Sequence, residues 1–131
     1  MIVLDTQIWV WWVNDEQMIP PALLGYLEVN EKYGLGVSTI SVLEVARLAA
    51  AKRLVLPVLL DEWVDQALHY PNVSLIELSP QIAIESTRLP EPFHKDPADR
   101  IVVATANSLN SALATTDAKI RAYPHVKTID Y

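Results

Sequence analysis

Two spacings of apolar residues alternate along this chain, and together they predict alternating strands and helices. Short apolar or alternating runs predict strands at residues 2–4, 34–39, 72–78, 111–115 and 126–129. Apolar residues at helical spacing predict seven helices. The first follows residue 5 and runs to residue 13, and the others span residues 20–32, 41–52, 59–69, 81–88, 97–109 and 117–122. Two of these starts carry a capping residue followed by proline, at Ser79-Pro80 and Asp96-Pro97.

The expected fold is a three-layer α/β/α sandwich with a central parallel sheet of about five strands, formed by one domain over residues 1–131. In open sheets of this kind, ligands bind beyond the carboxyl ends of the strands. Four acidic residues fall at that edge. Asp5 and Asp117 follow strands, while Glu44 and Asp99 lie in the first turns of predicted helices.

Composition excludes several classes of protein. The chain contains no cysteine, which excludes thiolate chemistry, iron–sulfur ligation and a disulfide scaffold, and fits a reducing cytosol. No apolar stretch approaches the roughly eighteen residues of a membrane span, and the acid at position five argues against a secretory leader. We therefore expect a cytoplasmic protein without a membrane partner.

Carboxylates that meet at one sheet edge repel each other, which raises the pKa of some of them unless a cation neutralises the group. Mg²⁺ or Mn²⁺ is expected there, because hard divalent ions take oxygen ligands and leave room for substrate phosphates. Such ions support phosphodiester hydrolysis. His69, His94 and His125 are scattered, so neither a histidine-pair ribonuclease nor a zinc site of ordinary spacing is supported.

Helix capping offers a structural interpretation of the same acids. Ser41 and Glu44 fit a capping box, in which Glu44 reaches back to the backbone of Ser41. Asp96 and Asp99 fit the N-cap and third position of a helix, and Asp96 is the better cap of the two. The two acids that follow strands can each cap the next helix. Capping and ligand roles both stay open for each residue.

Four segments carry these acids: residues 2–6, 38–46, 96–106 and 113–117. Their order and spacing run through nearly the whole chain. Together they resemble the PIN-domain family, specifically the VapC-type toxin ribonucleases of bacterial toxin–antitoxin systems.

The resemblance implies a five-stranded parallel sheet, Mg²⁺ or Mn²⁺ held by acidic residues, and endonucleolytic cleavage of RNA. The acidic positions of the family fall on Asp5, Glu44, Asp99 and Asp117, which would hold the metal and carry the catalysis. Asp96 is an additional acid found in this subgroup, and it is either a further metal ligand or only a helix cap.

The resemblance also implies substrate contacts and partners. Thr6 and Thr116 match family positions that bind water or phosphate, whereas Gln7 stands where the subgroup often has histidine. VapC-type toxins act in the cytoplasm, usually dimerise, and are held inactive by an antitoxin that inserts a peptide into the active-site groove. RNA, a cognate antitoxin and a second copy of the chain are therefore the expected partners.

Further residues have two interpretations each. Arg47 and Arg100 lie close to acids in sequence and could contact RNA phosphates or an antitoxin carboxylate, or pair with those acids instead. His94 sits in a proline-rich loop near Asp96, where it could shuttle a proton, although a lone loop histidine is expected to face solvent. Of the three tryptophans at positions 9, 11 and 12, two are expected in the core, the alternative being an exposed groove for a partner.

Two other functions fit parts of the pattern. One is a PIN fold used only for binding, which the intact acidic set argues against. The other is a receiver-like signalling domain with a metal and a phosphoacceptor in the same pocket. Receivers have an acid pair near the first strand and a lysine ending a later one. Here Asp5 has no acidic neighbour, and Lys119 comes only after Asp117.

The net charge of −6, from sixteen acidic and ten basic residues, opposes general attraction to phosphate. Most of the excess is local, because eleven acids face ten bases once the five acids named above are set aside. Bound divalent cations would convert that acidic pocket into one that accepts phosphate. We therefore expect RNA binding to depend on metal.

Overall fold

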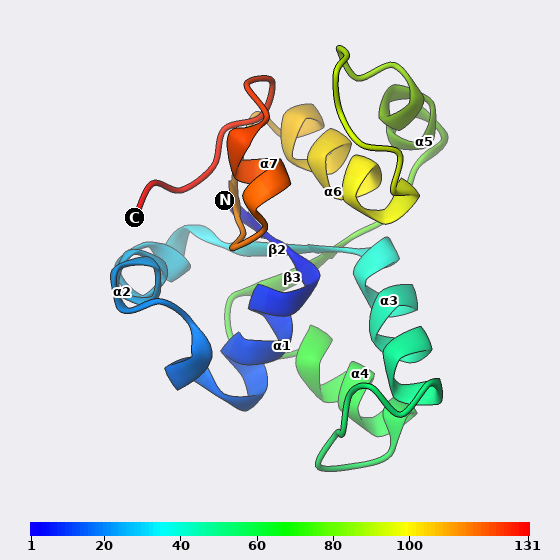
Figure 1. Ribbon diagram of the computed structural model, residues 1–131. Helices are drawn as coiled ribbons and strands as arrows, with labels where there is room; N and C mark the ends of the chain where they lie inside the picture. Colours follow the sequence, from blue (N-terminus) through cyan, green and yellow to red (C-terminus); the bar gives the residue numbers. More distant parts are fainter.

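The computed structural model describes residues 1–131, and its centre is a four-stranded parallel sheet between two layers of helices (Figure 1). The strands lie in the order β3-β2-β1-β4. Their bounds are Ile2–Leu4 for β1, Leu35–Ser38 for β2, Val73–Ile76 for β3 and Ala112–Ala114 for β4. This confirms the predicted α/β/α sandwich with a parallel sheet.

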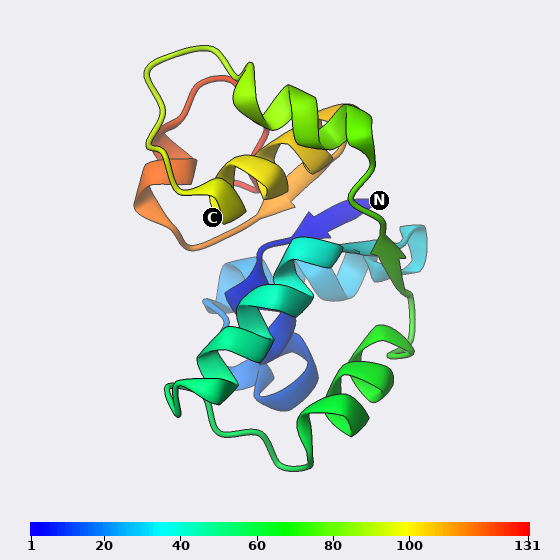
Figure 2. The ribbon, with the colours of Figure 1, turned by 90° about the vertical axis from the view of Figure 1, so that its right-hand side faces the viewer.

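Seven α-helices cover the two faces of the sheet. They are α1 (Thr6–Asn14), α2 (Pro21–Asn30), α3 (Thr39–Ala50), α4 (Leu60–Leu68), α5 (Pro80–Thr87), α6 (Pro97–Ser108) and α7 (Ala118–Ala122). Two short 3₁₀ helices, Glu16–Met18 and Glu31–Tyr33, flank α2. The first four helices lie on one side of the sheet and the last three on the other, as Figure 2 shows from a second direction. No helix combines the length and the apolar character that crossing a membrane requires.

Side chains of β1 alternate between the two faces and so divide the core. Ile2 and Leu4 pack into the larger apolar cluster, with residues of α1 to α4. Val3 packs into a smaller cluster with residues of α6 and α7. The central strand is therefore buried on both faces, which explains its continuous apolar run.

The tryptophans of α1 lie mainly in the larger cluster. Trp9 and Trp12 are buried and Trp11 is partly buried, which confirms that two of the three belong to the core. The Trp9 ring packs against Trp63 of α4, with centroids 5.0 Å apart. These rings anchor the helix that begins directly after the first acidic residue of the predicted site.

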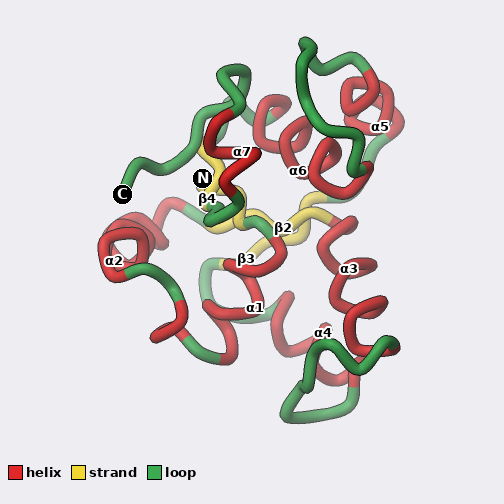
Figure 3. Tube along the Cα trace, viewed as in Figure 1, coloured by secondary structure: helices red, strands yellow, loops and turns green.

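The predicted fifth strand at residues 126–129 is reduced to a single bridge, between Leu113 and Thr128. Leu113 N donates to Lys127 O (2.8 Å), and Ile129 N donates to Leu113 O (3.1 Å). The chain turns at residues 124 and 125, and Ser111 N, the next donor backwards along the ladder, bonds instead to Ala106 O (2.9 Å). The segment after α7 is therefore drawn as loop in Figure 3.

Helix α3 begins at Thr39, two residues before the predicted start. Ser38 is the N-cap, because its side chain accepts from Ile40 N (3.2 Å). The predicted capping box of Ser41 and Glu44 is therefore wrong. Ser41 lies inside the helix, and Glu44 lies in its second turn, where its carboxylate is free of any capping role.

Candidate active site

Five acidic residues gather where the carboxyl ends of β1 and β4 meet α3 and the first turns of α6 and α7. They come from four separate segments of the chain, and the charges of four of them raise the pKa of the fifth, Asp99: Asp5, Glu44, Asp96 and Asp117. The structure thus places every acid selected from the sequence at one edge of the sheet.

Asp5 follows β1 and is held at both carboxylate oxygens. Its Oδ1 accepts from Thr6 N (2.9 Å), which makes it the N-cap of α1, and its Oδ2 accepts from Thr115 Oγ1 (2.6 Å). Its own backbone N–H donates to Ala114 O at the end of β4 (2.9 Å). These contacts fix the carboxylate to both strand ends.

Thr115 is a site residue that sequence reasoning missed. Its hydroxyl donates to Asp5 and accepts from the backbone N–H of Asp117 (3.0 Å), so it links the acid after β1 to the acid after β4. Thr116, which was selected instead, forms no hydrogen bond, and its role as a substrate contact stays a prediction. The available signal was a hydroxyl residue at the end of a predicted buried strand.

Glu44 is oriented by the hydroxyl of Thr6, which is itself held by the hydroxyl of Ser41. Thr6 Oγ1 donates to Glu44 Oε1 and also forms a hydrogen bond with Ser41 Oγ at 2.8 Å. Thr6 and Ser41 are both buried. Thr6 therefore supports an acidic side chain through its hydroxyl while its backbone N–H supports Asp5.

Asp96 and Asp117 are both helix caps, which was one of the two interpretations left open for each. Asp96 Oδ1 accepts from the N–H groups two and three residues ahead, at 2.9 and 3.4 Å. Asp117 Oδ1 accepts in the same way, at 2.8 and 3.1 Å. Only one oxygen of each carboxylate is used, so capping leaves the other available to a cation.

Asp99 lies in the first turn of α6 and faces His94. The distance from His94 Nε2 to Asp99 Oδ2 is 3.2 Å, and the histidine side chain is only 22% exposed. The prediction that His94 faces solvent is therefore wrong. The Phe93 ring stands nearly perpendicular to the imidazole, with centroids 4.5 Å apart, and holds it inward.

Burial and mutual repulsion make three of the acids costly to ionise. Burial raises the pKa of Asp5 and of Glu44, against the lowering effect of the hydroxyls that bond to them. Burial, followed by repulsion from the other acids of the site, raises the pKa of Asp99 to about 7. A cation placed among these carboxylates would stabilise the ionised form of all three.

Two cavities open on the acids and share Asp96. One, of about 400 Å³, is lined by His94, Asp96, Asp99, Asp117, Ala118 and Lys119. The other, of about 450 Å³, is lined by Glu44, Arg47, Leu48, Ala51, Arg53, Asp96 and Ala98. The first brings three carboxylates together, and the second adds two guanidinium groups beside Glu44, as expected for a site that receives phosphates.

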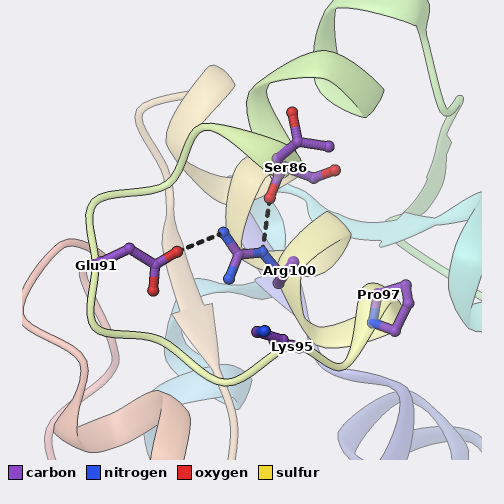
Figure 4. Close-up of a pocket in the computed structure, with 6 residues that line it drawn as sticks. Ser86, Glu91, Lys95, Pro97 and Arg100 are labelled. Atoms are coloured by element: carbon purple, nitrogen blue, oxygen red, sulfur yellow. Dashed lines mark hydrogen bonds and ion pairs between the residues drawn. The ribbon is translucent and has the colours of Figure 1, made fainter.

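Arg100 points away from these cavities and holds the loop before α6. Its Nε donates to Ser86 O (2.9 Å), and its terminal nitrogens contact Phe93 O, His94 O and Glu91 Oε1 at 3.2–3.4 Å. Figure 4 shows the guanidinium between Ser86 and Glu91 in a separate cavity of about 350 Å³. The structure thus gives Arg100 a role in shaping the loop, and its contact with RNA stays a prediction.

The chemistry of the acidic set fits a hard divalent cation. Five carboxylates supply oxygen donors, and no thiolate competes, because the chain has no cysteine. No three acidic or histidine side chains stand close enough together to surround an ion as they are placed. The donors are therefore suitable, while the ligand geometry is not preformed.

A family model described as the PIN domain matches residues 2–126 of the chain. The chain belongs to the PIN-domain family. The match includes the four segments that carry the acids of this PIN domain, so it confirms the resemblance noted from the sequence. It also sets aside the receiver-like alternative.

Proteins similar to this PIN domain include a named ribonuclease and the toxin–antitoxin complexes of two bacteria. It is 30% identical over 128 residues to Ribonuclease VapC22 of Mycobacterium tuberculosis, and the alignment covers 98% of this chain and 95% of the relative. VapBC2 of Rickettsia felis bound to promoter DNA has the same fold (TM-score 0.71, 19% identity, 98% of each chain). So does a toxin–antitoxin complex from Klebsiella pneumoniae (TM-score 0.65, 21% identity, 98% and 97% covered).

Proposed function

We propose that this PIN domain is the toxin of a VapBC-type pair, an endoribonuclease that hydrolyses RNA phosphodiester bonds with Mg²⁺ or Mn²⁺. The observation that carries the proposal is the gathering of five carboxylates at one sheet edge, three of them costly to ionise. Full-length similarity to a named ribonuclease supports the same enzyme class. The cytoplasm, where no disulfide is needed, is the proposed place of action.

The residues of the site have separable roles in this proposal. Asp5, Glu44, Asp99 and Asp117 would hold the metal, with Asp96 as an additional acid beside them. A bound divalent ion supplies Lewis-acid assistance to phosphodiester hydrolysis. The chain itself contributes hydrogen bonds to individual ligands, because hydroxyls and backbone N–H groups hold Asp5, Glu44 and Asp117, and the final ligand arrangement would form when the ion binds.

Cationic side chains around the acids would bind the RNA backbone. Arg47 and Arg53 line the cavity beside Glu44, and Lys119 lines the cavity beside Asp117. None of the three forms an ion pair within the chain, so each is available to a phosphate. Thr6 and Thr116 remain proposed contacts for water or phosphate, and Arg100 for an RNA phosphate.

An antitoxin is the proposed protein partner. The named structural neighbours are toxin–antitoxin complexes, and they share the fold over nearly the whole chain. An antitoxin side chain that enters the acidic cavities would need positive charge, because three carboxylates line one of them. A homodimer of this chain is part of the same proposal.

Cleavage of a mixed RNA substrate tests the proposed activity. We expect cleavage with Mg²⁺ or Mn²⁺, none with EDTA, and a loss of at least about a hundredfold for Asp5→Asn. Asp61→Asn, an exposed acid in the first turn of α4, is the matched control and should cleave normally. Cleavage that survives both EDTA and Asp5→Asn would exclude the metal mechanism. An intact, metal-loaded protein that cleaves nothing would indicate a binding-only PIN fold.

A further inference from the structure

One nitrogen atom beside the acidic site has no hydrogen-bond partner. The Nε2 atom of His94 is enclosed from solvent and forms no hydrogen bond, although it lies 3.2 Å from Oδ2 of Asp99. An ordinary ion pair would bring the ring N–H into line with the carboxylate oxygen, and here it does not. Buried polar atoms nearly always have a partner, so an unpartnered one beside a set of cation ligands points to a role as a ligand itself.

The imidazole of His94 is held in place by contacts of its own loop. Its backbone carbonyl accepts from the Arg100 guanidinium at 3.2 Å, and the Phe93 ring stands nearly perpendicular to the imidazole with centroids 4.5 Å apart. Phe93 in turn stacks on Tyr123, directly after α7, with centroids 4.3 Å apart. The position of the histidine is therefore set by the packing of this loop and not by Asp99 alone.

We propose that His94 is a ligand of the divalent cation, together with Asp99, and that the site therefore binds Mn²⁺ in preference to Mg²⁺. The inference rests on the metal-dependent function proposed above. It adds a nitrogen donor to the carboxylates and chooses between the two ions. His94 lines the same cavity of about 400 Å³ as three of the carboxylates, so the nitrogen and the oxygens face one space.

The spacing of the two donor atoms fits neighbouring positions around one ion. Two ligand atoms that bind an octahedral cation at right angles, each at about 2.1 Å, stand about 3 Å apart. The separation of 3.2 Å between His94 Nε2 and Asp99 Oδ2 is close to that value. No group of three such side chains is close enough to surround an ion, so the other carboxylates would close on the ion when it binds.

A nitrogen ligand separates the two candidate ions. Mg²⁺ takes oxygen ligands and gives up its waters reluctantly, so an imidazole contributes little to its binding. Mn²⁺ also takes carboxylates, but as a transition-metal ion it binds imidazole nitrogen more readily than Mg²⁺ does. The histidine is therefore the group in this site that distinguishes Mn²⁺ from Mg²⁺.

Titration of the metal-free protein with MnCl₂ or MgCl₂, without RNA, tests the assignment. We expect the wild-type protein to bind Mn²⁺ at least about tenfold more tightly than Mg²⁺. His94→Gln replaces the ring nitrogen by an amide, so it should lose Mn²⁺ affinity about ten- to a hundredfold and change Mg²⁺ affinity less than about threefold. His69→Gln makes the same change at an exposed histidine after α4, and this matched control should bind both ions as wild type does.

Pulsed electron paramagnetic resonance of the Mn²⁺-loaded protein gives a second measurement. A directly bound imidazole adds the modulation of its nitrogen nucleus to the Mn²⁺ spin echo, whereas a histidine that only supports the loop does not. The modulation should be present in wild type and absent from His94→Gln. It should also persist in the double variant His69→Gln/His125→Gln, which leaves His94 as the one histidine of the chain and so tests the assignment even where His94→Gln does not fold.

The outcomes distinguish this inference from the proposed function. A wild-type protein that binds neither ion contradicts the metal-dependent ribonuclease. A protein that binds Mn²⁺ without nitrogen modulation, or equally well in wild type and His94→Gln, overturns the histidine ligand and leaves the function standing. Nitrogen modulation that is lost in the double variant overturns it in the same way, because the signal would then come from another histidine.

Discussion

The candidate active site has two walls, and the acidic side chains on them are held by different kinds of hydrogen-bond donor. On the wall formed by β1 and α3, Asp5 is buried, Glu44 is partly buried, and each accepts a hydrogen bond from a threonine hydroxyl. On the wall formed by the starts of α6 and α7, Asp96 is exposed and Asp117 is partly buried, and both accept hydrogen bonds from backbone N–H groups. Burial raises the pKa of both carboxylates of the first pair.

This contrast separates two acids whose charge burial makes costly, Asp5 and Glu44, from two acids that cap helices closer to the surface, Asp96 and Asp117. A carboxylate at a helix N-cap is stabilised by the helix itself, so its charge costs the folded state little. Asp5 also caps a helix, α1, but burial outweighs that cap, and Glu44 has no cap. A cation would stabilise the charge of both carboxylates. Asp99 stands between the walls, in the first turn of α6 but crowded by all four other acids. Predictions that remove charge should therefore affect the walls differently.

The largest contrast is expected for Asp99→Asn against Asp117→Ala. Asp99→Asn removes a crowded charge, so the metal-free protein at pH 8 should unfold at a higher temperature, while RNA cleavage falls at least about a hundredfold. Asp117→Ala should lose both cleavage and roughly 1 kcal/mol of stability, because it also removes a cap. Thermal unfolding and cleavage rates check both. Equal destabilisation by the two substitutions would contradict the distinction between the walls.

Thr115→Val tests whether the hydroxyls of the buried wall are structural supports. The substitution keeps the shape of the side chain, but it removes the donor to Asp5 and the acceptor for Asp117 N. A loss of about 2–3 kcal/mol in the free energy of unfolding is expected, because a charged acceptor and a backbone donor both lose their partner. Chemical denaturation measures it.

Thr116→Val is the control for that substitution. It changes the adjacent residue, which forms no hydrogen bond, and should alter stability by less than about 0.5 kcal/mol. If Thr116→Val lowers cleavage without changing stability, the substrate contact predicted from the sequence is supported. A larger stability loss for Thr116→Val than for Thr115→Val would contradict the assignment of the supporting hydroxyl.

We expect the ionisation of Asp99 to dominate the dependence of the free energy of unfolding on pH. Its pKa is raised from 3.8 to about 7 in the folded protein, so the folded state binds this proton more tightly than the unfolded state between those values. The free energy of unfolding should therefore fall as pH rises from about 4 to about 7, on the order of 1–2 kcal/mol, and level off above.

Two controls isolate that group. Asp99→Asn should flatten the profile across the same range, and saturating Mg²⁺ should oppose the fall because it favours the ionised carboxylates. Unfolding in urea at a series of pH values, with EDTA or with Mg²⁺, gives the measurement. A metal-free protein whose stability rises steadily from pH 4 to pH 7 would contradict the crowding of these acids.

Local patterns in the sequence were sufficient to predict most of the strands and helices. Apolar runs located the four strands, and the two cap-proline pairs located the starts of α5 and α6, because both signals act within a few residues. The start of α3 was misplaced because Ser38 and Ser41 are both acceptable caps. The choice depends on where β2 ends and on the contact between Ser41 and Thr6, a residue 35 positions away.

The acidic residues of the site could be predicted from the sequence, but the hydrogen bonds that hold them could not. Strand ends and first turns predict which carboxylates reach the edge, since parallel strands deliver them to one side. The support from Thr115 to Asp5 spans 110 positions, and the inward turn of His94 depends on Arg100 and Phe93. Such contacts follow from packing between distant segments, which no local pattern encodes.

The smallest effect is expected where capping and charge can be separated at one residue. Asp96→Asn keeps a good N-cap and removes only the charge, whereas Asp96→Ala removes both. Asp96→Ala should lower the free energy of unfolding by about 1 kcal/mol, and Asp96→Asn should leave it nearly unchanged. Cleavage rates then decide the second role of this acid.

Equal cleavage by Asp96→Asn and wild type would make Asp96 only a cap. A loss in Asp96→Asn that excess Mg²⁺ or Mn²⁺ partly restores would make it a ligand as well, because a missing carboxylate weakens metal binding before it weakens chemistry. The free Oδ2 of the capping carboxylate permits that second role. The more exposed wall would then differ from the buried wall in how its charge is stabilised, and both walls would hold the metal.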